Sequence, residues 1–207
     1  MVYKNLFNRL FFSLFFFLIY FIALNDKYLL FLIGSIIYLF VFYEILKFFN
    51  KLYFKLILLY LLLSYLCFGI YFFISYDYLI FNIFVFTIIL FDSFSYFSGK
   101  LFGNNYLFKY LSPKKTLEGY LGGVFCTNVT QVFFLYFLQI EIEIIALLIL
   151  INLTILISVF GDLIESFFKR KNNIKDSSNY LPGHGGFFDR FDSFIGAIII
   201  LTFFSFF

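Results

Sequence analysis

Charged residues are scarce in this sequence, and tryptophan is absent. Only 13% of the 207 residues are Asp, Glu, Lys or Arg, whereas 63% are hydrophobic. The mean hydropathy of +0.99 lies well outside the range of soluble domains. The scarcity of charge therefore argues against a soluble globular protein and indicates a membrane protein.

Cysteine is almost as scarce. Cys67 and Cys126 lie inside apolar runs and show no C-x-x-C spacing, which argues against a disulfide or a zinc site. The N-terminus, with Lys4 and Arg9 before a long apolar run, resembles a signal peptide, but no small-residue cleavage site follows. We interpret it as a retained first helix.

Proline, histidine and arginine are also rare, and their positions are informative. The abundance of Phe (39) and Tyr (17) and the excess of Lys over Arg are typical of an AT-rich genome. In such a chain, Gly, Pro, Arg and His are expected where a role requires them. Both prolines, the only histidine, two of the three arginines and nine of the twelve glycines lie between Gly99 and Arg190. The functional residues are predicted there.

Long apolar stretches dominate the rest of the chain. A membrane-spanning helix needs about 20 apolar residues, and seven stretches qualify: 6–24, 28–49, 54–75, 78–98, 118–139, 143–168 and the shorter 193–207. The sequence predicts an all-α integral membrane protein with about seven transmembrane helices, whose cytoplasmic polar loops form the active site. Residues 1–91 would supply N-terminal helices and 92–207 the catalytic region, within a single membrane domain.

Basic residues predict the orientation, because they stay on the cytoplasmic side. Alternating the seven spans puts fourteen of the fifteen basic residues on one side and leaves only Lys27 opposite. The N-terminus would then be cytoplasmic. Two polar segments, 100–117 and 169–192, would also face the cytoplasm.

The polar stretch Ser166–Asp192 has the richest chemistry. Its Gly-His-Gly-Gly turn would let backbone amides approach a phosphate closely. A nucleotide triphosphate with Mg²⁺ needs cations that contact its phosphates and carboxylates that bind the metal. In this stretch basic residues alternate with acids: Lys169, Arg170, Lys175 and Arg190 with Asp176, Asp189 and Asp192. The alternative is a solvated loop that binds anionic lipid.

Three charged residues at the end of the sixth span share one helix face. Asp162, Glu165 and Lys169 have the spacing i, i+3, i+7, so their side chains are predicted to face one cavity. A carboxylate at the edge of a hydrocarbon span is costly and usually functional. A structural pair between Glu165 and Lys169 is the alternative, and it leaves Asp162 without a partner.

The end of the fourth span carries a second stripe, formed by Asp92, Tyr96, Gly99 and Gly103. Glycines at this spacing allow close helix packing. Packing alone would explain the glycines. It does not explain an acid inside an apolar run.

A basic segment follows, reading Ser112-Pro113-Lys114-Lys115-Thr116 and then Glu118-Gly119. We interpret it as a proline-stiffened turn that opens a helix and holds phosphate oxygens through its amides and the helix dipole. A basic patch on the lipid surface is the alternative interpretation.

These segments resemble the phosphatidate cytidylyltransferase family. Ser166–Asp192 meets every constrained position of its 27-residue signature, S-x-hydrophobic-K-R-x4-K-D-x-small-x2-hydrophobic-P-x-H-G-G-hydrophobic-x-D-R-hydrophobic-D. Three further patterns resemble the family: D-S-x-x-Y-x-x-G-K-x-x-G from Asp92, S-P-K-K-T-x-E-G from Ser112, and G-D-x-x-E-S from Gly161. The resemblance runs from Asp92 to the C-terminus, and the N-terminal half matches only in hydropathy. Most family members are longer by about two helices before the Asp92 pattern.

The resemblance implies a reaction of CTP with phosphatidic acid that gives CDP-diacylglycerol and pyrophosphate, with Mg²⁺ required and K⁺ assisting. It also implies a homodimer in a bacterial inner membrane, with a funnel that faces the cytoplasm, and no nucleic acid as partner. The implied metal ligands are Asp162 and Asp189. The implied catalytic residues are these two with Lys169, Arg170, His184 and Arg190, and the implied substrate-binding residues are Ser112, Pro113, Lys114, Lys115, Thr116, Glu118, Lys175, Asp176, Gly185, Gly186, Asp192 and Asp92. His184 remains open between a general acid and a neutral phosphate contact.

Other functions are weighed against this one. A polyprenol kinase would also use CTP on a membrane lipid but would transfer the γ-phosphate to an alcohol. A CDP-alcohol phosphatidyltransferase is disfavoured because its D-x2-D-G-x2-A-R pattern is missing. A small multi-pass transporter predicts polar residues near the middle of several spans, whereas the acids here lie at the span ends.

Overall fold

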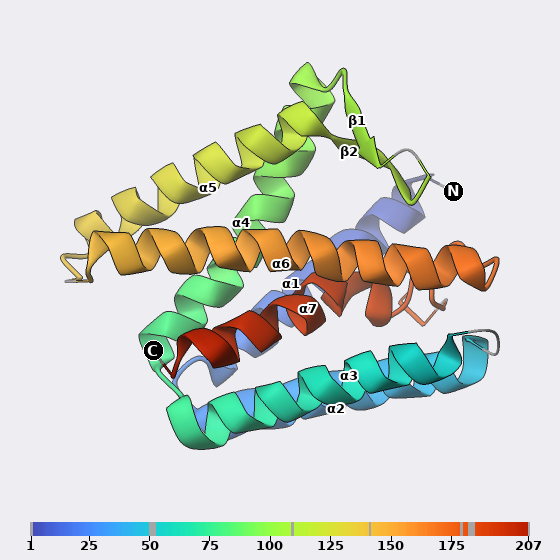
Figure 1. Cartoon of the computed structure of the whole chain (residues 1–207), viewed down its shortest axis with the longest axis horizontal. Helices are drawn as coiled ribbons and strands as arrows, with labels where there is room; N and C mark the ends of the chain where they lie inside the picture. The colour runs from blue at the N-terminus through green and yellow to red at the C-terminus, as the bar shows by residue number, and fades with distance from the viewer. Residues whose placement is uncertain are drawn as a thin grey trace.

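The computed structural model describes residues 2–49, 53–108, 110–140, 142–178, 180–181 and 185–206, with the backbone alone for 2–10, 12–13 and 113–114. Within these ranges the chain forms seven α-helices and a two-stranded hairpin (Figure 1). The elements are α1 (Val2–Ala23), α2 (Lys27–Phe48), α3 (Phe54–Ile70, continued by a π-helical turn over Tyr71–Ser75), α4 (Tyr78–Phe102), β1 (Tyr106–Phe108), β2 (Ser112–Thr116), α5 (Leu117–Phe137), α6 (Ile144–Lys171) and α7 (Phe188–Phe204).

Five helices, α2 to α6, are long and apolar enough to cross a membrane. Large apolar side chains cover their outer faces, and Ile74, Leu101 and Phe137 are each about 70% exposed. Surfaces of this kind are stable only in lipid. The prediction of a helical membrane protein is therefore confirmed. The count of seven spans stays a prediction, because α7 has only 17 residues and, of α1, only Leu14–Ala23 counts as an apolar helix within the described residues.

The ends of the helices sort toward two sides of the bundle. In Figure 1 the α2–α3 ends, the hairpin and the α6–α7 ends lie toward the right, while the α5–α6 connection and the C-terminus lie toward the left. The right-hand group carries the polar segments that separate the apolar spans. This arrangement places the hairpin and the predicted signature stretch at the same end of the bundle.

Buried aromatic rings and a few polar contacts hold the helices together. Phe68, Phe84 and Phe188 are almost fully buried in the core. The Ser64 hydroxyl on α3 donates to the Ile195 carbonyl on α7 at 2.6 Å. A hydroxyl that bonds a neighbouring helix in this way satisfies its polar atoms without water, as lipid-embedded helices require.

Glycines bring two helix pairs into close contact. A Cβ atom at Gly119 on α5 would lie 2.8 Å from the Ser95 carbonyl and 3.1 Å from the Gly99 Cα on α4. A Cβ at Gly161 on α6 would lie 2.5 Å from the backbone carbonyl of Asp192 on α7. Only glycine fits at Gly119 and Gly161, and the first crossing brings Gly119 against Gly99 of the α4 stripe, as expected for a stripe that allows close packing.

The fold departs from the all-α prediction at one place. The segment Ser112–Thr116, interpreted as a turn, is the second strand of an antiparallel hairpin with Tyr106–Phe108. Its last residue, Thr116, then caps α5 by accepting a hydrogen bond from the Gly119 amide at 3.2 Å. β1 has only three residues, and β2 reads Ser-Pro-Lys-Lys-Thr without alternating apolar residues, so neither strand could be recognised from the sequence.

Candidate active site

Three carboxylates from α6 and α7 gather at the centre of the candidate site. Asp162, Glu165 and Asp192 each offer an oxygen, and these oxygens lie within 4.8 Å of one another. The close α6–α7 crossing brings them together. Glu165 is 1% exposed, and none of the described residues donates a hydrogen bond to its Oε1 atom. Like charges at this distance repel one another, and three carboxylate oxygens so close together could hold a cation.

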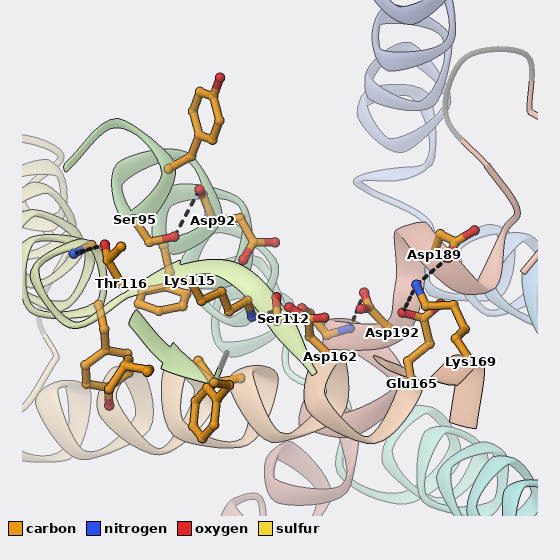
Figure 2. Close-up of a pocket in the computed structure, with 18 residues that line it drawn as sticks. Asp92, Ser95, Ser112, Lys115, Thr116, Asp162, Glu165, Lys169, Asp189 and Asp192 are labelled. Atoms are coloured by element: carbon orange, nitrogen blue, oxygen red, sulfur yellow. Dashed lines mark hydrogen bonds and ion pairs between the residues drawn. The ribbon is translucent and has the colours of Figure 1, made fainter. Parts of the chain in front are cut away.

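Two lysines approach the cluster from different elements. Lys115 on β2 forms an ion pair with Asp162. Lys169 Nζ on α6 lies 2.8 Å from Glu165 Oε2 and 2.7 Å from Asp189 Oδ1. Figure 2 shows Lys115 reaching across from the hairpin, and Lys169 held between its two acidic partners. The structural pair between Glu165 and Lys169 is present, and the hairpin supplies the partner that Asp162 lacked.

Asp189 is held by the segment that precedes α7. Its Oδ2 atom accepts hydrogen bonds from the amides of Ser177 and Gly186, both at 2.8 Å, and from the Ser177 hydroxyl at 3.0 Å. Burial raises the pKa of Asp189. A hydrogen bond with the Glu165 carboxyl group, the positive charge of Lys169 and the hydrogen bond from the Gly186 amide together outweigh burial and hold the pKa below its ordinary value. Asp189 is therefore an ionised, well-anchored group.

These groups line a cavity of about 360 Å³ between α4, α5, α6, α7 and the hairpin. Figure 2 shows Asp92 and Ser95 on the side away from Asp189 and Lys169. Among the described lining residues, five carboxylates face two lysines. This excess of acidic over basic groups suits a cation better than an anion alone.

A model of the cytidylyltransferase family matches residues 2–207. The chain belongs to the cytidylyltransferase family.

Curated relatives named phosphatidate cytidylyltransferase match part of this chain, among them one from Staphylococcus aureus and one from Haemophilus influenzae. The Staphylococcus aureus (strain COL) protein is 42% identical over 114 residues, which are 54% of this chain and 43% of the relative. The Haemophilus influenzae protein is 43% identical over 120 residues, which are 56% of this chain and 42% of the relative. The matched part spans less than half the length of either relative. The family resemblance drawn from the motifs is confirmed.

The cavity of this cytidylyltransferase family member collects about half of the residues predicted from sequence. The lining includes Asp92, Ser112, Lys115, Thr116, Asp162, Lys169, Asp189 and Asp192. The predicted helix stripe with Glu165 faces the cavity as expected. Asp162 pairs with Lys115 and accepts a hydrogen bond from the Ser166 hydroxyl at 3.4 Å. Its neighbours in the carboxylate cluster are Glu165 and Asp192, and Asp189, the other predicted metal ligand, is not a member of that cluster.

The remaining predicted residues that the structure describes lie outside this lining. Arg170 and Arg190 are exposed helix residues, and Lys175 and Asp176 line a separate hollow with Ser178 and Tyr180. The side chains of Pro113 and Lys114 lie outside the described residues, as does His184. Gly185 and Gly186 form the backbone around Asp189.

Glu118, predicted to bind substrate, contacts the base of the hairpin. Its carboxylate accepts hydrogen bonds from the Asn104 amide at 3.1 Å and from the Asn105 side chain at 2.7 Å. Both asparagines precede β1, so this contact ties the hairpin to the first turn of α5. It thereby helps to place Lys115 over Asp162.

Sequence reasoning missed Glu44 on α2. It is fully buried and bonds the segment between α6 and α7. The available signal was an acid within the second apolar run, the same signal that drew attention to Asp92. It was overlooked because no recognisable family pattern surrounds it.

Replacing Lys169 by methionine should destabilise the protein by about 3 kcal/mol, because Glu165 and Asp189 would be left as buried acids without their cation. Thermal unfolding in detergent would measure this loss. Lys55→Met, at an exposed position in the first turn of α3, is the control and should leave the unfolding midpoint almost unchanged. Equal midpoints for the two variants would contradict the role of Lys169.

Proposed function

We propose that this protein is a CTP:phosphatidate cytidylyltransferase, which makes CDP-diacylglycerol and pyrophosphate for phospholipid synthesis. The observation that carries the proposal is a cavity of carboxylates and lysines at the ends of membrane helices. Such a cavity suits a polyphosphate that must meet a lipid headgroup. The names of the relatives agree with this chemistry.

The reaction would be an in-line displacement. An oxygen of the phosphatidate phosphate attacks the α-phosphorus of CTP and forms the new P–O bond. The bond from that phosphorus to the oxygen bridging to the β-phosphorus breaks, and pyrophosphate leaves with the electron pair. No base is needed because the attacking phosphate is already ionised. The protein's contribution is positioning and charge stabilisation, with Lys115 and Lys169 the cavity cations able to contact phosphate oxygens.

The donor set suits Mg²⁺, which prefers oxygen ligands. Asp162, Glu165 and Asp192 are close enough to share one ion, and Oε1 of Glu165 accepts no hydrogen bond from the described part of the chain. When bound, the ion would neutralise the phosphates and polarise the α-phosphorus. Asp189, the second ligand implied by the resemblance, stays a proposal, as does an assisting K⁺.

The setting of the enzyme is also proposed. The polar ends at one side of the bundle would face the cytoplasm, in a bacterial inner membrane, because basic residues stay on that side. Residues 1–91 would support the catalytic region 92–207, and the protein would act as a homodimer without nucleic acid.

An assay in detergent with CTP labelled on the α-phosphate and phosphatidate as acceptor tests the proposal. We expect labelled CDP-lipid and one pyrophosphate per turnover. Chelation by EDTA should abolish the product, and added Mg²⁺ should restore it. A polyprenol kinase would instead release CDP and a phosphorylated alcohol from a polyprenol acceptor. No labelled lipid with phosphatidate, at any Mg²⁺ concentration, would refute the proposal.

A further inference from the structure

A buried acid on α2 binds the segment that leads into α7. Glu44 has no exposed surface, although it lies in a span of apolar residues. Its carboxylate accepts hydrogen bonds from the hydroxyls of Ser177 (3.1 Å) and Ser178 (2.6 Å) and from the amides of Phe187 (2.8 Å) and Phe188 (3.0 Å). A buried carboxylate is tolerated when donors satisfy its oxygens in this way. All four donors belong to one segment.

Two of these donors are the amides at the start of α7. The first amides of a helix have no partner within the helix, and a carboxylate is a favourable cap for them. α7 has no cap from the side chain of its own N-cap residue, Phe187. Glu44 supplies the cap from another helix and thereby fixes where α7 begins. The position of Asp189, in the first turn of α7, follows from this start.

The Ser177 hydroxyl links Glu44 to Asp189 directly. The Ser177 Oγ atom lies 3.1 Å from Glu44 Oε2 and 3.0 Å from Asp189 Oδ2. A hydroxyl carries one hydrogen, so it donates to one of these carboxylates at a time. Gly186 lies against the same group, because a Cβ there would approach both Glu44 oxygens to 2.7 Å. Glu44 is thus one residue removed from the cavity.

The aromatic residues of α2 reinforce the contact. Phe40 stacks on Phe187, with ring centroids 4.6 Å apart and planes 9° apart. The Lys47 ammonium donates to the Tyr180 hydroxyl at 3.0 Å. Positions 40, 44 and 47 have helical spacing, so one face of α2 receives the whole segment.

We propose that Glu44 is a positioning residue of the active site. It does not line the cavity. It acts by holding Ser177, Ser178 and the start of α7, so that Asp189 and Asp192 face α6. The expected effect of Glu44 on turnover rests on the proposed function, whereas its expected effect on the start of α7 does not.

Hydrogen–deuterium exchange of the full chain in detergent tests the structural consequence. In Glu44→Gln, the side-chain NH₂ group would face hydrogen-bond donors, so part of the capping interaction would be lost. The backbone amides of Phe187 and Phe188 should then exchange at least about tenfold faster. Amides of α5 should keep their protection. Glu143→Gln is the matched control, because Glu143 is exposed and makes no side-chain cap at α6. Unchanged exchange at Phe187 and Phe188, or equal loss across α5, would overturn the inference.

Turnover of CTP and phosphatidate tests the kinetic consequence. Glu44→Gln should lower kcat per folded molecule by about 10–100-fold, as expected for a group that orients site residues. The KM for CTP should stay within about threefold. Glu44→Asp, which keeps the carboxylate, should recover part of the loss. A purely structural role would lower the folded fraction and leave kcat per folded molecule at the Glu143→Gln value, which would overturn the inference.

Failure of the proposed function, and failure of Glu44→Gln to fold, can each be told apart from failure of the inference about Glu44. If the unchanged chain does not convert CTP and phosphatidate, the proposed function fails and the exchange measurement alone decides the role of Glu44. If Glu44→Gln does not fold, Ser178→Ala replaces it, because this change removes one donor to Glu44. Faster exchange at Phe187 and Phe188 in Ser178→Ala would support the inference, and unchanged exchange would overturn it.

Discussion

Asp162→Asn should lower the turnover of CTP and phosphatidate by more than about 100-fold, because it removes charge from the centre of the carboxylate cluster. The measurement is the initial rate of CDP-lipid formation across a range of Mg²⁺ concentrations. Asp77→Asn is the matched control. Asp77 caps α4 through the amides of Leu79 and Ile80, and asparagine caps a helix about as well as aspartate. The control should keep its activity.

The same assay separates the candidate metal ligands. Glu165→Gln and Asp192→Asn should raise the Mg²⁺ concentration that gives half-maximal rate, because both share the cluster with Asp162. Asp189→Asn should do so only if Asp189 leaves Lys169 and binds the ion. If Asp162→Asn turns over CTP within about threefold of the unchanged chain, Asp162 is not a ligand.

Gly186→Ala should remove most of the activity as well. The added Cβ would collide with the Ser177 hydroxyl and lie 2.7 Å from both oxygens of Glu44. Overpacking of this kind costs about 1–3 kcal/mol, and relief of the clash would move the residues that hold Asp189. We expect the rate to fall more than about tenfold and the thermal midpoint to drop.

Gly69→Ala on α3 is the control for Gly186→Ala. A Cβ at Gly69 would meet nothing within 4 Å, and alanine in a helix interior is favoured over glycine by about 0.5–1 kcal/mol. This variant should keep full activity and an equal or higher midpoint. If both glycine variants behave alike, the close packing around Gly186 does not matter for the enzyme.

Helices α2 to α6 could be predicted because their apolar runs are long enough to span lipid. Their ends were less predictable. α4 continues to Phe102 and α6 to Lys171, beyond the apolar residues that define the spans. A helix does not have to end where the hydrocarbon ends. Lysines in these last turns stabilise the helix ends, because their positive charge lies at the negative end of the helix dipole. The start of α7 at Phe188 depends on Glu44, which lies 144 residues away and appears in no local pattern.

Part of the candidate site could be predicted from the periodicity of a single helix. Asp162, Glu165 and Lys169 share a face through helical periodicity alone. The approach of Asp192 required the crossing of two helices at Gly161, and the approach of Lys115 required a hairpin. Contacts between distant segments depend on tertiary packing, which a single sequence does not display.

The bond between Glu44 and the residues before α7 also has a consequence for biosynthesis. The chain leaves the ribosome from its N-terminus, so α2 enters the bilayer well before Ser177 and Phe188 have been translated. Until then, the Glu44 carboxylate has none of the four donors that satisfy it in the finished protein. The nascent α2 would therefore carry a costly buried acid, and the arrival of Ser177, Ser178 and the start of α7 would relieve that cost.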